Sequence, residues 1–247
     1  MRTTHRILSS AVAVSLVLVI SACGSSSGSD GSKDATTTTK AKAEVTTTTA
    51  ADSSDDAQAR ADSVDWKLAD FPDGWTSTPP TDGDSKSPVA DCDPALGDES
   101  VQLAKHATDD YSIGSIDNGD GVQVTARTVV FSDADAAKAA VAPFSEPDVI
   151  TCIDETLKQA YTSGGNDVTV DGTLGPEAAS SDAEETTGLS AAYTVSAGDG
   201  STLDVKMGIL VVRTGDVVTN IVIQAVDPNF DPSTLPVNQL VDALNAA

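Results

Sequence analysis

Four stretches of alternating apolar side chains constrain this fold more than any other feature of the chain. A period of two places the apolar side chains of a strand on one face of a β-sheet. Thr214-Gly215 separates the last two stretches and is typical of a tight turn, so residues 202–226 are predicted to form one long hairpin. Val168 and Val170 indicate a weaker fifth strand. The four stretches run from Val122 to Val130, Leu189 to Val195, Leu203 to Val211 and Val217 to Ala225.

Three further segments are predicted to be helical. An alanine-rich stretch over about 133–142 ends at Pro143. A second helix has Pro147 in its first turn and carries an apolar face that ends at Tyr161. The last helix covers about 235–246. One-sided strands with a few amphipathic helices predict an α+β fold, in which two or three helices cover one face of an antiparallel sheet.

The N-terminus has the order of features expected of an export signal. A short basic head precedes the apolar stretch 11–20, which is too short to span a bilayer comfortably. The quartet Ile-Ser-Ala-Cys that follows resembles the bacterial lipobox, whose cysteine is acylated and becomes the new N-terminus. We expect residues 1–22 to be a lipoprotein signal peptide and Cys23 to be the lipid anchor. An ordinary secretory signal with a chance cysteine is the alternative.

A low-complexity segment follows the predicted anchor. Residues 24–62 contain eight Thr and seven Ser, and Val45 is their only large apolar residue. Such a segment buries too little apolar surface to offset the entropy lost on ordering. Residues 23–62 are therefore predicted to be a lipidated, disordered tether. The remaining 63–247 are long enough for a single extracytoplasmic domain with its own core.

The charge balance excludes one class of partner. The chain has 14 Lys and Arg against 38 Asp and Glu, a formal net charge of −24. From residue 64 onward there are 8 basic and 31 acidic side chains, so the folded domain carries −23. A nucleic-acid partner is not expected, because neutralising phosphates requires a surplus of Lys and Arg. The predicted location is the outer face of the cell membrane, held there by the lipid anchor.

Lipidation of Cys23 leaves two cysteines. Export places Cys92 and Cys152 in an oxidising compartment, where such a pair is expected to form a disulfide. A zinc site made of Cys92, His106 and Cys152 is the alternative, although it lacks the CxxC spacing and needs a fourth ligand.

No constellation of residues predicts a particular chemistry. His106 is the only histidine after the signal, so a Ser-His-Asp triad would have to use it. The loop Asp117–Gly121 resembles a calcium loop, but its alignment puts Ile116 and Arg127 where carboxylates are needed, which favours a turn. Asp182, Glu184 and Glu185 form an acidic cluster that we expect on a solvated loop. No catalytic residue, metal ligand or cofactor is assigned.

One segment is rich in aromatic residues. Trp66, Phe71 and Trp75 fall within eleven residues, with Pro72 and Gly74 between them suited to a turn. They are predicted to cover one end of the core. The alternative is that they form an aromatic lip beside a ligand groove.

The order of these features resembles an actinobacterial class of secreted, lipid-anchored proteins. The lipobox and tether are followed by the motif DFPDGW, Cys92, the strand-to-helix junction VVFSDADAAKAA, Cys152 and a final hairpin with a C-terminal helix. The domain also resembles the extracellular sensor domains of mycobacterial-type serine/threonine kinases and the PsbP-like lipoproteins. Those kinase domains typically have two disulfides, whereas this chain can form only one. The resemblance implies an α/β sandwich with a groove and a binding or sensing role.

The sequence therefore predicts a non-enzymatic cell-envelope lipoprotein. Its domain is expected to bind an unidentified small molecule, lipid or protein outside the membrane. A hydrolase that uses carboxylates or His106, and a cation-binding surface module, are the alternatives.

Overall fold

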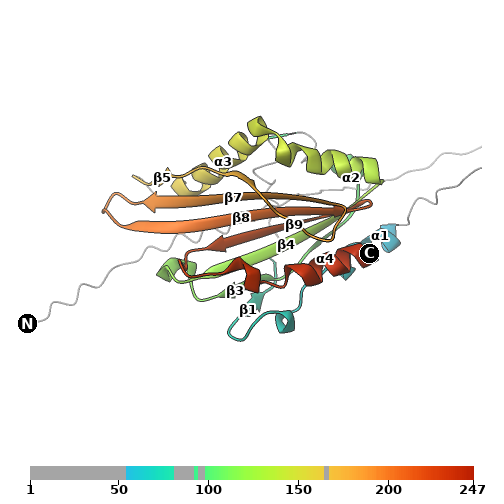
Figure 1. Cartoon of the computed structure of the whole chain (residues 1–247), viewed down its shortest axis with the longest axis horizontal. Coiled ribbons are helices and arrows are strands. Elements are labelled where there is room, and N and C mark those ends of the chain that lie inside the picture. Colours follow the sequence, from blue (N-terminus) through green and yellow to red (C-terminus); the bar gives the residue numbers. More distant parts are fainter. Residues whose placement is uncertain (1–53, 81–91, 94–97, 164–166) are drawn as a thin grey trace, which may run out of the picture.

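The computed structural model describes residues 54–80, 92–93, 98–163 and 167–247. These residues form nine strands: β1 (Thr76–Thr78), β2 (Gln102–Ala107), β3 (Asp110–Ile113), β4 (Val122–Phe131), β5 (Thr169–Asp171), β6 (Gly175–Glu177), β7 (Glu185–Ser196), β8 (Thr202–Thr214) and β9 (Val217–Ala225). The strands make one antiparallel sheet in the order β1-β3-β4-β9-β8-β7-β5, while β2 pairs with β4 and β6 with β7 (Figure 1). The predicted α+β class is confirmed.

The long central strands are those that the alternation predicts. The four stretches correspond to β4, β7, β8 and β9, and the weaker fifth strand is β5. The predicted hairpin joins β8 to β9 through two residues, with Gly215 in the left-handed conformation that such a turn requires (φ 57°). The sequence does not reveal β1, β2, β3 and β6, because strands of three to six residues with mixed exposure have no clear period.

Helices cover both faces of the sheet, whereas the sequence predicted one covered face. Two helices, α2 (Ala134–Val141) and α3 (Pro147–Thr162), lie on one side of the sheet, and two more, α1 (Ser54–Ser63) and α4 (Val237–Ala246), lie on the other (Figure 1). The cause lies in β8 and β9, which are apolar on both faces at the end where they join. Val211 and Val218 pack toward α2 and α3, while Val212 and Val217 pack toward α1 and α4.

The folded part begins earlier than the sequence indicated. The predicted tether extended to residue 62, but the structure places residues 54–63 in helix α1. Ala57, Ala61 and Val64 are completely buried in the core on the α4 side. Their spacing of three to four residues puts them on one face, and alanine allows the helix to approach the sheet closely. Arg60 adds an ion pair with Asp216 and donates from Nε to the Ala247 carbonyl over 2.9 Å.

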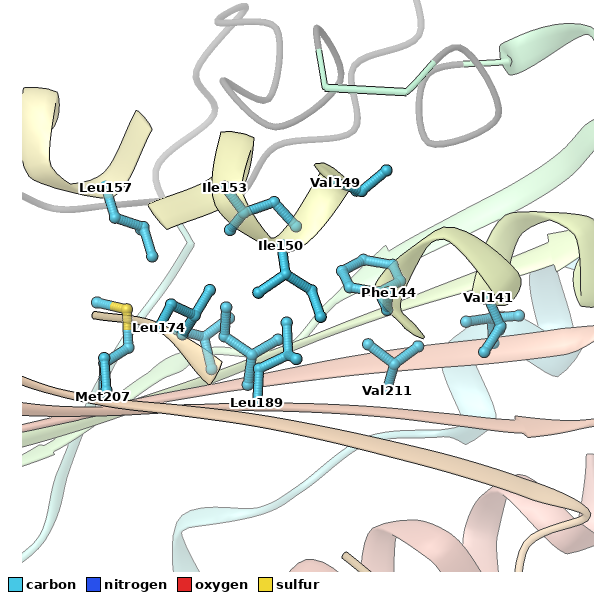
Figure 2. Packing of buried hydrophobic residues seen from close by; sticks show 14 of the residues in the cluster. Val141, Phe144, Val149, Ile150, Ile153, Leu157, Leu174, Leu189, Met207 and Val211 are labelled. Carbon is cyan, nitrogen blue, oxygen red and sulfur yellow. The ribbon is translucent and has the colours of Figure 1, made fainter. Parts of the chain in front are cut away.

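Helix α3 contributes more core residues than α2 on this side of the sheet. Its apolar face points down onto the strands, and the preceding turn contributes Phe144 (Figure 2). Opposite it lie Leu174 from the β5–β6 connection and side chains of β7 and β8, such as Leu189 and Met207. The α3 residues labelled in Figure 2 are Val149, Ile150, Ile153 and Leu157.

The structure contains a disulfide between Cys92 and Cys152. The two Cα atoms are 5.6 Å apart and the residues are separated by 60 positions. Cys152 belongs to α3, and Cys92 packs against the α3 side of the core. The bond therefore fixes residues 92–93 to this helix. It also contradicts the zinc alternative, because a disulfide leaves no thiolate to bind metal.

A buried carboxylate connects α3 to the sheet. Asp154 is 6% exposed and accepts hydrogen bonds from Tyr193 Oη (2.6 Å), the Leu174 backbone N–H (2.8 Å) and Lys158 Nζ (2.7 Å). Burial by itself raises the pKa of Asp154, but these hydrogen bonds and the charge of Lys158 outweigh it and lower the pKa. The network ties the helix, β7 and the β5–β6 connection together.

The predicted anchor lies outside the described residues, as do the signal peptide and most of the tether. Within the described ranges, no helix combines the length and the apolar character needed to cross a membrane.

Candidate functional site

An apolar groove lies on the α4 side of the sheet, away from the residues that the sequence singled out. Its volume is about 530 Å³, within the range of small-molecule sites. Strands β6, β7, β8 and β9 form its floor, and the segment between β9 and α4 contributes to its lining. Most of the lining side chains are apolar or consist of glycine and alanine.

Small residues on neighbouring strands leave space above the floor of the groove. Strand register places Gly175, Ser190, Gly208 and Ile223 next to one another across β6, β7, β8 and β9. The neighbours of Ser190 and Gly208 along their strands, among them Ala191 and Met207, are buried on the α3 side. Since successive side chains alternate between faces, Ser190 and Gly208 face the groove. Ser190 and Gly208, side by side on β7 and β8, leave space over strands that would otherwise carry larger side chains.

The segment between β9 and α4 forms the wall. Phe230, Pro232 and Val237 line the groove, and Phe230 is half-buried against the core on the α4 side. Two contacts hold the segment: Lys206 Nζ donates to the Pro228 carbonyl (2.9 Å) and Trp66 Nε1 donates to the Pro236 carbonyl (3.0 Å). The wall is therefore fixed at both ends, and Phe230 lies between these contacts.

Polar groups lie at the two ends of the floor. At the β6 end the Ser190 hydroxyl donates to the Glu177 carboxylate. Lys206, which pairs with Ala192 across β7 and β8, lies toward the other end. Glu177 is the only carboxylate among the described residues that line the groove, so no pair of carboxylates is available there for glycoside chemistry.

The two glycines of the floor have different roles. A Cβ atom on Gly188 would lie 2.8 Å from Ala179 Cβ and 2.9 Å from the Glu177 carbonyl oxygen, so glycine is required where β6 and β7 approach. A Cβ atom on Gly208 would lie 3.8 Å from its nearest neighbour, Ile223. This is an ordinary van der Waals distance. A Cβ atom therefore fits at Gly208, and because Gly208 lines the groove, a larger side chain there would extend into it.

The aromatic segment lies in the core rather than in the groove. Trp66, Phe71 and Trp75 are 1%, 7% and 9% exposed, and none of them lines the groove. Phe71 stacks on Tyr111 at 4.3 Å between ring centroids, and Tyr111 donates its hydroxyl to the Trp66 carbonyl. Burial raises the pKa of Tyr111, so its hydroxyl stays protonated as a donor. These contacts explain how the aromatic segment covers one end of the core.

His106 lies on β2 beside α1 and does not line the groove. Its Nδ1 is 3.2 Å from Asp62 Oδ1, and its Nε2 is 3.4 Å from Asp65 Oδ1. Both ring nitrogens of His106 therefore lie beside carboxylates. Within the described ranges, no three His, Cys, Asp or Glu side chains are grouped to hold a metal ion.

The acidic segments have structural partners. Arg213 binds both Glu184 and Glu185 at 2.9 Å. In the loop near residue 117, Gly119 adopts a left-handed conformation and Asp120 Oδ1 accepts from the Ser115 backbone N–H. These residues therefore form a turn, which the sequence favoured over a calcium loop.

No family model matches this sequence, and no curated protein sequence is significantly similar to it. Among solved structures, the extracellular domain of PknH from Mycobacterium tuberculosis is similar with a TM-score of 0.40 and 11% identity, covering 77% of this chain and 95% of that chain. LpqN, described as involved in cell envelope biogenesis of Mycobacterium tuberculosis, has a TM-score of 0.28 and 10% identity, covering 72% of this chain and 78% of that chain.

These similarities are too low to support a conclusion about function. The expected resemblance to kinase sensor domains stays a prediction. The resemblance to PsbP-like lipoproteins stays a prediction.

The residues that form the groove were not predicted from the sequence. A usable signal is present in β7 and β8, where Gly188, Ser190 and Ala192 alternate with buried residues and Gly208 follows the same pattern. Small residues at alternate positions of adjacent strands indicate a sheet face that no side chain covers. That signal becomes informative only when the strand register is known.

Proposed function

We propose that this protein is a membrane-anchored, non-enzymatic binding domain outside the cell that holds an apolar ligand in the groove between its sheet and the 226–237 segment. The groove carries the proposal. It has the size of a ligand site, an apolar lining and a wall fixed by hydrogen bonds at both ends. A preformed site of this kind requires little rearrangement when a ligand binds.

Replacement of Gly208 with leucine tests the groove directly. The added Cβ atom fits against Ile223 and the rest of the side chain extends into the groove, so we expect the fold to be retained while the affinity for the neutral fluorescent probe N-phenyl-1-naphthylamine falls by about tenfold or more. Fluorescence titration of the mature-length protein measures the affinity, and circular dichroism reports the fold.

Thr169→Leu is the matched control, since it adds a leucine at an exposed strand position outside the groove. If the probe binds the wild type and Gly208→Leu equally well, the groove is not its site and the proposal fails. A robust hydrolytic activity abolished by a substitution at His106 would also overturn it in favour of an enzyme.

The membrane anchor is supported by the sequence of residues 1–23. If Cys23 is the lipidated residue, Cys23→Ala should move the protein from the membrane fraction to the soluble fraction, because several acyl chains are needed for stable anchoring. Membrane fractionation followed by mass spectrometry of the N-terminal peptide measures this. Membrane partitioning that is unchanged in Cys23→Ala would contradict the anchor and leave the groove proposal unaffected.

A further inference from the structure

We infer that the groove selects a single-chain amphiphile whose polar end donates hydrogen bonds and carries no negative charge. Glu177 is the residue that accepts hydrogen bonds from this polar end. This inference rests on the proposed function and adds the chemistry of the ligand to it.

The polar groups at the β6 end of the floor are acceptors. The Ser190 hydroxyl has one hydrogen, and it is donated to Glu177. The remaining capacity of the pair therefore consists of lone pairs on the Ser190 oxygen and the Glu177 carboxylate. A ligand group placed there must donate hydrogen bonds, as a hydroxyl or an ammonium does. A carboxylate or sulfate would bring lone pairs against lone pairs and negative charge against Glu177.

The charges around the groove also favour a ligand whose polar end carries no negative charge. The domain from residue 64 onward carries a formal charge of −23, which repels anionic amphiphiles before they reach the groove. The one cation in the lining, Lys206, is exposed and donates to the Pro228 carbonyl, which makes it part of the support of the wall. Charge complementarity therefore favours a neutral or cationic polar end next to Glu177.

The shape of the groove limits the apolar part of the ligand. The low row formed by Ser190 and Gly208 crosses β7 and β8 and ends against Ile223 on β9, with Phe230 contributing to the wall. An alkyl chain laid along this row contacts apolar atoms on its floor and wall while its polar end stays at β6. The geometry thus suits one unbranched chain.

A series of twelve-carbon probes with different polar ends tests this inference. Dodecyl maltoside offers hydroxyl donors, dodecylamine offers an ammonium group, and dodecanoate offers only a carboxylate. Isothermal titration of the mature-length protein, with each probe below its micelle concentration, should show that dodecyl maltoside and dodecylamine bind at least about tenfold more tightly than dodecanoate.

Glu177→Gln keeps the size of the side chain and removes its charge. It should reduce the preference for dodecylamine over dodecanoate by about tenfold.

Two control variants separate the possible outcomes. Glu155→Gln removes the same charge from an exposed position of α3, and it should leave the preference unchanged. If Lys206→Gln removes dodecanoate binding while Glu177→Gln has no effect, the ligand is oriented the other way and the inference is overturned.

The inference and the proposed function can fail separately. Equal binding of all three probes, blocked by Gly208→Leu, overturns the role of Glu177 and preserves the groove as the binding site. Failure of every probe and of the naphthylamine to bind the wild type overturns both.

Discussion

Removal of the Cys92–Cys152 disulfide should lower the free energy of unfolding by about 4 kcal/mol, because the bond closes a long loop in the unfolded chain. The two cysteines are separated by 60 positions, so the cross-link removes many conformations from the unfolded state. In the folded state the bond holds residues 92–93 against α3, where Cys92 packs on the core. Urea denaturation of the wild type and of the double variant Cys92→Ser/Cys152→Ser measures the difference.

A reductant supplies the internal control for this prediction. It should destabilise the wild type to the level of the double variant and leave the double variant unchanged. A difference between wild type and variant below about 1 kcal/mol would show that the cross-link constrains the unfolded chain far less than its loop length indicates. Two free thiols in non-reduced mature protein would show that the bond does not form.

Replacement of Asp154 with alanine should cost about 3 kcal/mol, the range expected when one partner of a buried polar network is removed. The Tyr193 hydroxyl and the Leu174 backbone N–H would both lose their acceptor in a buried site. Lys158 adds less to this loss because its side chain is 28% exposed and can turn to water. Chemical denaturation measures the effect. Glu155→Ala, an exposed neighbour on the same helix, should change stability by less than about 0.5 kcal/mol.

The same carboxylate should make stability depend on pH in acid. Because the folded state lowers the pKa of Asp154, its contribution is present above the ordinary pKa near 3.8 and is lost as the pH falls through the lowered value. The gap in unfolding free energy between wild type and Asp154→Asn should therefore shrink as the pH falls from about 6 to about 2. A gap that stays constant or widens over this range would contradict a lowered pKa at Asp154.

Local patterns predicted the long strands because their period depends only on neighbouring residues. Each strand from β4 to β9 that exceeds eight residues alternates clearly, and Gly215 identifies the turn between the last two. Helix α1 was missed because its apolar face consists mainly of Ala57 and Ala61, and alanine in a polar, low-complexity segment resembles a tether. Its stability comes from packing against the sheet and from Arg60.

The aromatic residues near the start of the domain cover one end of the core, as the sequence favoured, and the groove lies elsewhere. Trp66, Phe71 and Trp75 are prominent in composition, yet they fill the core on the α4 side. Glycine, serine and alanine form the groove floor and leave no such signal. The groove exists because these small side chains leave the space above the strands unfilled.

The sequence by itself determined the class of the fold, the strands that build its centre and the pair of cysteines left to form a disulfide. Each of these follows from residue spacing or residue count along the chain. Only the tertiary structure decided which helices cover which face and where an apolar groove opens. Ser190 and Gly208 become neighbours because β7 and β8 pair in one register, and Phe230 lines the same groove because the chain turns back after β9. Register is set by long-range packing of both sheet faces, and no local pattern of the sequence contains it.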